Sequence, residues 1–193
     1  MKNFGENEMP TAFTHAAVAL AANIALPPQN RRPRLAALAV VCAVVPDLDI
    51  LGFFFGLPYG HLLAHRGFFH SPFFNFVVAF AIMGVFFRDI KTCSPKWSRL
   101  FLYLLFVGAS HGLLDALTNG GLGVAFLAPF DSTRFFLPWA PIPVSPIRIR
   151  SFLSPWGWEV LKSELLRVWV PCFSAAWLAR MVRGLPPKEF GGV

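Results

Sequence analysis

The chain has 193 residues, of which 55% are hydrophobic and only 14% are charged. A soluble domain carries about 25% charged residues, so this composition excludes an ordinary soluble globule and favours a membrane protein. The net charge of +7 does not indicate a nucleic-acid partner, because the basic residues cluster between hydrophobic blocks, as topology signals do. Three separated cysteines without a CxxC pair indicate neither a disulfide framework nor a thiolate metal site.

The apolar blocks predict an all-α, polytopic protein with a bundle of about five membrane helices. In chain order they cover residues 11–26, 35–45, 73–87, 100–117 and 154–184. Several are shorter than the ~20 apolar residues that cross a bilayer comfortably. The first block could also be a cleaved signal peptide, but Glu6 and Glu8 beside Lys2 make a poor positively charged leader.

Two proline patterns shape the predicted bundle. Asp47 and Asp49 follow Pro46, where we expect the second helix to stop. Ser154-Pro155 predicts the start of the last helix, with an N-cap residue followed by proline at the first helical position, and Pro171 predicts a kink within it.

Residues 119–154 are too rich in glycine and proline for a regular helix. We predict an irregular outer cap there, with Trp139 and several phenylalanines at the membrane interface. The whole chain, 1–193, is interpreted as a single membrane-embedded domain.

Basic residues predict the orientation of this bundle. With five crossings, segments 27–34, 88–99 and 180–193 share one side, and they hold ten of the seventeen basic residues. The positive-inside rule then places the N-terminus outside and the C-terminus in the cytoplasm, in a multi-pass protein of the inner (plasma) membrane.

Histidines and aspartates recur in four short stretches that this topology places on the same outer face. These candidate metal ligands are His15, Asp47, Asp49, His65, His70, His111 and Asp115. His111 and Asp115 are four residues apart, so they project from one face of a helix. Taken singly, each stretch has an ordinary explanation, such as a turn aspartate, an interfacial histidine or a core histidine. Their shared location favours a metal site.

The donor set is imidazole and carboxylate without thiolate, which fits divalent zinc, manganese or iron better than copper(I). Zinc is favoured. These ligands are more than one tetrahedral ion needs, so they predict two or three ions, which together could activate a water and clamp a phosphoryl oxygen.

Asp49 and His70, which belong to this set, and Arg66, which does not, have other candidate roles. Asp49 and His70 are either ligands or orienting partners, and Asp49 is a candidate general base. Arg66 is predicted to hold a substrate anion through its planar fork, with help from cap arginines Arg134, Arg148 or Arg150.

With these residues assembled, the chain resembles the YdjM-like family of membrane-bound metal-dependent hydrolases. The resemblance rests on Thr14-His15, Pro46-Asp47-Leu48-Asp49, the run from His65 to Ser71, and the run from His111 to Thr118. The family commonly has threonine where Phe69 stands. The order of ligands is also, more loosely, similar to that of zinc-dependent phospholipases C.

The predicted function is hydrolysis of a phosphate ester in a lipid or lipid-linked molecule by a metal-activated water at the outer leaflet. The alternative is a non-enzymatic membrane protein that senses or transports divalent cations. Transport is disfavoured because no histidine or acidic residue lies midway in the third or fifth predicted helix. A nuclease is disfavoured because no basic, aromatic-laced soluble groove is visible.

Overall fold

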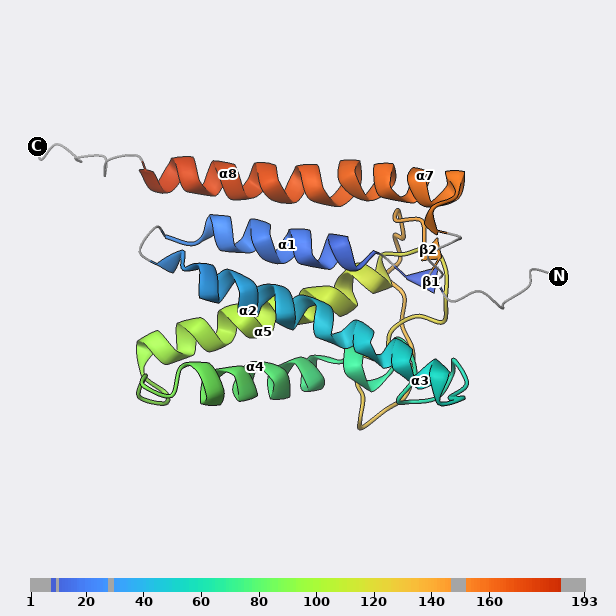
Figure 1. Cartoon of the computed structure of the whole chain (residues 1–193), viewed down its shortest axis with the longest axis horizontal. Coiled ribbons are helices and arrows are strands. Elements are labelled where there is room, and N and C mark those ends of the chain that lie inside the picture. Colours follow the sequence, from blue (N-terminus) through green and yellow to red (C-terminus); the bar gives the residue numbers. More distant parts are fainter. Residues whose placement is uncertain (1–7, 10, 28–29, 147–151, 185–193) are drawn as a thin grey trace, which may run out of the picture.

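The computed structural model describes residues 8–9, 11–27, 30–146 and 152–184, and they form an all-α membrane protein (Figure 1). Its α-helices are α1 (Ala12–Ala25), α2 (Pro33–Val44), α3 (Leu51–Phe54), α4 (Pro72–Phe86), α5 (Pro95–Ala116), α7 (Pro155–Glu164) and α8 (Val170–Gly184). Strands are limited in the described part to β1 (Glu8–Met9) and β2 (Ser145–Pro146), which pair in antiparallel fashion.

Hydroxyl side chains start three of these helices. The side chains of Thr11, Ser71 and Ser94 accept hydrogen bonds from the backbone three residues on, at the starts of α1, α4 and α5. Pro95 then opens α5, five residues before the predicted start. The predicted start of the last helix at Pro155 is confirmed.

The second α-helix, α2, ends at Val44, just before Pro46 as predicted, but the chain does not leave the helical path there. The chain tightens into a 3₁₀ helix over Val45–Ile50 and continues into α3, giving an apolar helical stretch of 22 residues, Pro33–Phe54. Pro46 lies in the first turn of the 3₁₀ segment, where its missing N–H is not needed. The tighter winding places both aspartates in one buried turn.

Pro171 is accommodated without a break. A π-helical turn, Leu165–Trp169, joins α7 to α8, and the two form one rod in Figure 1. Proline cannot donate to the carbonyl four residues before it, Arg167, and the wider turn lies at that position.

Two other stretches reach membrane-spanning length besides Pro33–Phe54: Pro95–Ala116 and Pro155–Arg183. The helices α1 and α4 are apolar but shorter. In Figure 1 α7 and α8 lie along one edge and α4 along the other, with α1, α2 and α5 between them. The core between α2, α4 and α5 includes small residues such as Ala39, Ala43 and Ala79, which let the helices approach closely.

The residues after α5 form the predicted irregular cap. From residue 117 to 146 the chain contains no helix, and isolated bridges join Thr118 to Ile142 and Val124 to Phe135. The cap covers the end of the bundle where α5 finishes and α1 begins (Figure 1).

Candidate metal centre

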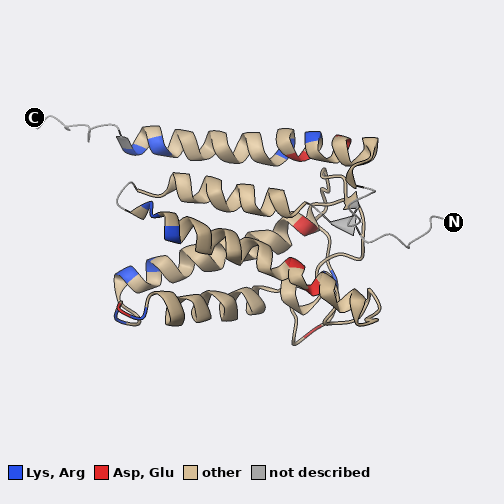
Figure 2. Ribbon diagram, viewed as in Figure 1, with Lys and Arg blue, Asp and Glu red and all other residues tan. Residues whose placement is uncertain are grey.

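All seven predicted ligands meet at the capped end of the bundle. They come from α1, from the 3₁₀ turn after α2, from the loop before α4 and from the last turns of α5. Each side chain is buried, and the most exposed, Asp47, has 7% of its surface accessible. Figure 2 shows Asp and Glu mostly toward this end, and Lys and Arg mostly toward the end where α8 finishes.

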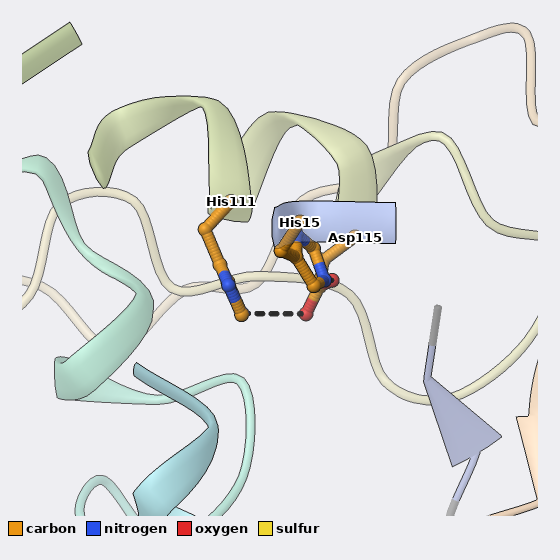
Figure 3. Close-up of side chains that lie close together, drawn as sticks. All are labelled: His15, His111 and Asp115. Carbon is orange, nitrogen blue, oxygen red and sulfur yellow. Dashed lines mark ion pairs between the residues drawn. The ribbon is translucent and has the colours of Figure 1, made fainter. Parts of the chain in front are cut away.

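The first candidate ligand group joins α1 to the end of α5. His15, His111 and Asp115 point toward one another (Figure 3), and their ligand atoms lie within 4.8 Å of each other. His15 Nε2 is 3.4 Å from Asp115 Oδ1, and the two imidazole rings stack with centroids 3.7 Å apart. His111 Nδ1 donates to the backbone oxygen of Ala43 at 2.7 Å, which leaves Nε2 free to bind a cation.

The second group, Asp47, His65 and His70, lies on the side of the 3₁₀ turn. Asp49 contacts both of its histidines through their Nδ1 atoms, at 2.9 Å for His65 and 3.1 Å for His70. A carboxylate on Nδ1 fixes the orientation of an imidazole and directs Nε2 at a metal. In this geometry Asp49 orients two ligands at once.

The two groups are in contact. Asp47 Oδ1 lies 3.3 Å from His111 Nε2, and Asp115 Oδ2 lies 3.1 Å from His70 Nε2. Each group therefore offers a carboxylate to the other, as a pair of neighbouring cations with shared ligands requires.

Unsatisfied polar atoms test whether this chemistry fits a metal. Among the described residues, all but three of the buried side-chain nitrogens and oxygens without a hydrogen-bond partner belong to this cluster and Arg66; the three are in Tyr59, Asn75 and Ser163. Leaving one such atom unpaired costs about 1–3 kcal/mol. Imidazole nitrogens and carboxylate oxygens are the donors that zinc takes in proteins, so the residues fit divalent cations.

The surroundings shift the pKa values of the two loop histidines in opposite directions. Burial lowers the pKa of His65, which favours the neutral, metal-binding ring. Burial acts in the same direction on His70, but its contacts with Asp115 and Asp49 prevail and raise its pKa to about 10. Metal ligation requires the unprotonated ring, so binding at His70 would release a proton.

Arg66 lies differently from the position expected for an anion-binding residue. Its side chain is fully buried, with Nη1 donating to Gly120 O at 2.7 Å and Nη2 donating to Thr118 Oγ1 at 2.9 Å. Nε is 3.5 Å from Asp115 Oδ2. The residue has a positive φ of 62°, and its carbonyl accepts from Ala125 N. Substrate binding by Arg66 stays a prediction. This geometry favours a structural role, in which Arg66 links the loop that carries His65 and His70 (the ligand loop) to the cap and to Asp115.

Arg66→Lys separates these two roles. Lysine keeps the charge beside Asp115 but loses the fork that reaches Gly120 and Thr118, so we expect the free energy of unfolding to fall by about 1–3 kcal/mol. Metal content should remain near wild type because no ligand is changed. Thermal unfolding and elemental analysis of one preparation check this, with the exposed Arg88→Lys as control. Unchanged stability with slower turnover would restore the substrate-binding role.

Of the three cap arginines, the structure describes Arg134. Arg134 is half-buried and donates to backbone oxygens of the ligand loop, at 3.1 Å for His65 and 3.2 Å for His61. Arg134 therefore joins the cap to the loop. Arg148 and Arg150 lie outside the described residues. His61 itself is exposed and outside the cluster.

Sequence reasoning missed Glu164. This fully buried carboxylate of α7 accepts hydrogen bonds from Thr11 N at 2.7 Å, Thr11 Oγ1 at 2.5 Å and Thr14 Oγ1 at 2.7 Å. It thus anchors the start of α1 directly before His15. An acidic residue in an apolar helix was the signal available in the sequence.

Comparisons with known proteins agree with the helical membrane fold. The model of the YdjM inner membrane protein family matches residues 9–185. The chain is 40% identical over 163 residues to Inner membrane protein YbcI of Escherichia coli (strain K12), which covers 84% of this chain and 92% of that protein. No solved structure gives a significant match. These names and the apolar helices support an inner-membrane location, and the chain belongs to the YdjM inner membrane protein family.

Proposed function

We propose that this protein is a metal-dependent hydrolase that cleaves a phosphate ester in a lipid or lipid-linked molecule. One observation carries the proposal: two groups of buried imidazoles and carboxylates touch each other and leave their ligand atoms without hydrogen-bond partners. Two adjacent divalent cations, when bound, lower the pKa of water and stabilise the oxygens of a phosphoryl group.

The residues of the cluster have separate roles. Hydrogen bonds at Nδ1, to Ala43 O for His111 and to Asp49 for His65, fix the two imidazole rings so that each Nε2 stays available for a metal. Asp47 and Asp115 connect the two groups. Because both oxygens of Asp49 face histidine nitrogens, we assign Asp49 an orienting role in preference to that of general base.

A lipid substrate is supported by the surroundings of the cluster. The segments that carry or cover the ligands expose large apolar side chains, namely Phe54, Phe55, Phe130 and Trp139, with exposed fractions of 72–84%. Aromatic side chains of this kind settle at the headgroup level of a bilayer. A substrate anchored in the membrane would reach the cluster from there.

We infer a multi-pass arrangement with the cluster on the outer, periplasmic side. The described basic residues of segments 30–34, 88–99 and 180–184 lie at the other end of the bundle (Figure 2), as the positive-inside rule expects for the cytoplasmic end.

The proposal is tested by release of phosphate or of a phosphorylated headgroup from a panel of phospholipids and lipid-linked phosphates, with protein freed of metal and then loaded with zinc, manganese or iron. We expect loaded protein to release one of these products, and His65→Ala to lower the rate by more than about 100-fold, since even outer partners of a metal are worth about 10–100-fold. The exposed His61→Ala is the matched control.

Right-side-out and inverted membrane vesicles complete the experiment. A membrane-impermeant short-chain substrate should be hydrolysed by the first and not by the second. Activity in inverted vesicles alone would mean that the cluster faces the cytoplasm, and it would still support the proposed hydrolysis. Protein that binds metal at His65 but releases neither phosphate nor a phosphorylated headgroup from any substrate would favour the sensor or transporter alternative.

A further inference from the structure

A second site lies at the basic end of the bundle, away from the metal cluster. A pocket of about 310 Å³ opens there between the end of α1, the start of α2 and the first turns of α5. This volume is at the lower end of the range of ligand pockets, about 300–1,000 Å³. The proposed hydrolase does not use this pocket.

The rim of the pocket carries two cations that have no ion-pair partner in the described part of the chain. Lys96 and Arg99 line it and are exposed. Arg99 donates its Nε to Pro95 O at 3.0 Å, and its two terminal nitrogens have no hydrogen-bond partner among the described residues. By contrast, the nearby Arg34 is engaged with Phe86, donating to its carbonyl and stacking on its ring.

The remaining wall is apolar and uncharged. It includes Leu35, which is buried, and Leu100, with the polar groups of Asn30 and Tyr103 beside them. Among the described residues, no acidic side chain lines the pocket. A ligand that fits must pair a negative group at the rim with an apolar part toward the helices.

The position of the pocket in the bundle also favours a ligand with a negative group and an apolar part. The pocket lies where α1, α2 and α5 begin or end, which is the level at which membrane helices leave the bilayer. Basic pockets between helices on the cytoplasmic side bind acidic lipid headgroups, and each nearby basic residue contributes about 1 kcal/mol to that attraction.

We propose that this pocket binds the phosphate-bearing headgroup of an anionic membrane lipid. The phosphate lies between Lys96 and Arg99, and the acyl chains follow the apolar surface of α1 and α5. Arg99 presents its two terminal nitrogens to the phosphate, and Lys96 adds a point charge. The absence of an acidic lining residue disfavours a zwitterionic headgroup, whose ammonium would meet two cations.

Lipid-dependent thermal unfolding of the full-length protein in detergent tests this site. Short-chain phosphatidylglycerol should raise the unfolding midpoint in a saturable manner, while short-chain phosphatidylcholine and inorganic phosphate should not. Lys96→Gln/Arg99→Gln should weaken the apparent lipid affinity by roughly 10- to 30-fold. Lys91→Gln/Arg88→Gln removes the same charge from the same end but outside the pocket, and should bind as wild type does.

Each other outcome overturns the assignment. An equal loss in both double variants means a diffuse basic surface, and equal stabilisation by phosphatidylcholine means detergent-like binding. Equal stabilisation by inorganic phosphate means that the apolar wall contributes nothing. If the pocket double variant fails to fold, the single variants Lys96→Gln and Arg99→Gln should each weaken binding by roughly fivefold, and unchanged affinity in both would overturn the proposal.

Discussion

Replacing Asp115 with asparagine is expected to remove most of the bound metal from the protein. The carboxylate of Asp115 is shared, with Oδ1 facing His15 and Oδ2 facing His70. Asparagine keeps the volume but loses the charge that both groups use. We expect metal affinity to fall by more than about 100-fold, since residues outside the ligand shell are already worth about 10–100-fold. Elemental analysis after equilibration with buffered free zinc measures the change.

The control is Asp131→Asn, which alters an exposed cap aspartate bonded only to Thr133 in the described chain. Asp115→Asn also deprives Arg66 of its buried counter-charge, so folding is checked by unfolding temperature. His15→Ala then probes the first group without touching that pair. Wild-type metal content in both Asp115→Asn and His15→Ala would refute the site as drawn.

Gly112→Ala is expected to disturb the metal centre without changing a ligand. A Cβ at position 112 would lie 2.6 Å from the backbone oxygen of His70, so α5 and the turn that carries His70 must separate. Overpacking of this kind costs about 1–3 kcal/mol. Stability and metal content should therefore fall together, as measured by thermal unfolding and elemental analysis.

Gly84→Ala provides the comparison. Position 84 is also a helical glycine, but a Cβ there has no neighbour within 4 Å, and alanine favours helix by about 1 kcal/mol. That variant should be at least as stable as wild type and retain its metal. If Gly112→Ala behaved in the same way, the close packing of α5 against the His70 turn would be wrong.

Much of the candidate site was readable from the sequence because its residues recur at the same end of successive apolar helices. The structure brings all seven predicted ligands together. His15, which taken alone could be a core histidine, stacks on His111, and this contact joins segments about a hundred residues apart. No local pattern reports such a contact.

The role of Arg66 could not be read in the same way. Its partners, Gly120 and Thr118, lie in the cap, and the positive φ at Arg66 turns the side chain toward them. Both features depend on how the cap closes over the ligand loop. Glu164 was missed for a related reason, because its partners are the first residues of the first helix.

A Ser-Pro pair marks the start of three helices, but only one of these pairs was used to predict a helix start from the sequence. Ser154-Pro155 predicted the start of the last helix, and the same pair occurs at Ser71-Pro72 and Ser94-Pro95, where α4 and α5 begin. Applied at Ser94-Pro95, it would have placed the start of α5 correctly, but a fourth pair, Ser145-Pro146, forms β2, so the pair alone does not specify a helix. The 3₁₀ winding through Pro46 had no such marker, because a proline after an apolar run also fits a helix end.

The hydrogen bonds from Thr11 and Thr14 to Glu164 bear on how the protein matures. Glu164 follows all seven candidate ligands in the sequence, yet it holds the helix turn that presents His15. Until the final helix has inserted beside α1, the first ligand group lacks this support. We therefore expect the candidate metal centre to be complete only after α7 has inserted beside α1, and a product truncated before α7 would carry every candidate ligand without the anchor that aligns the first.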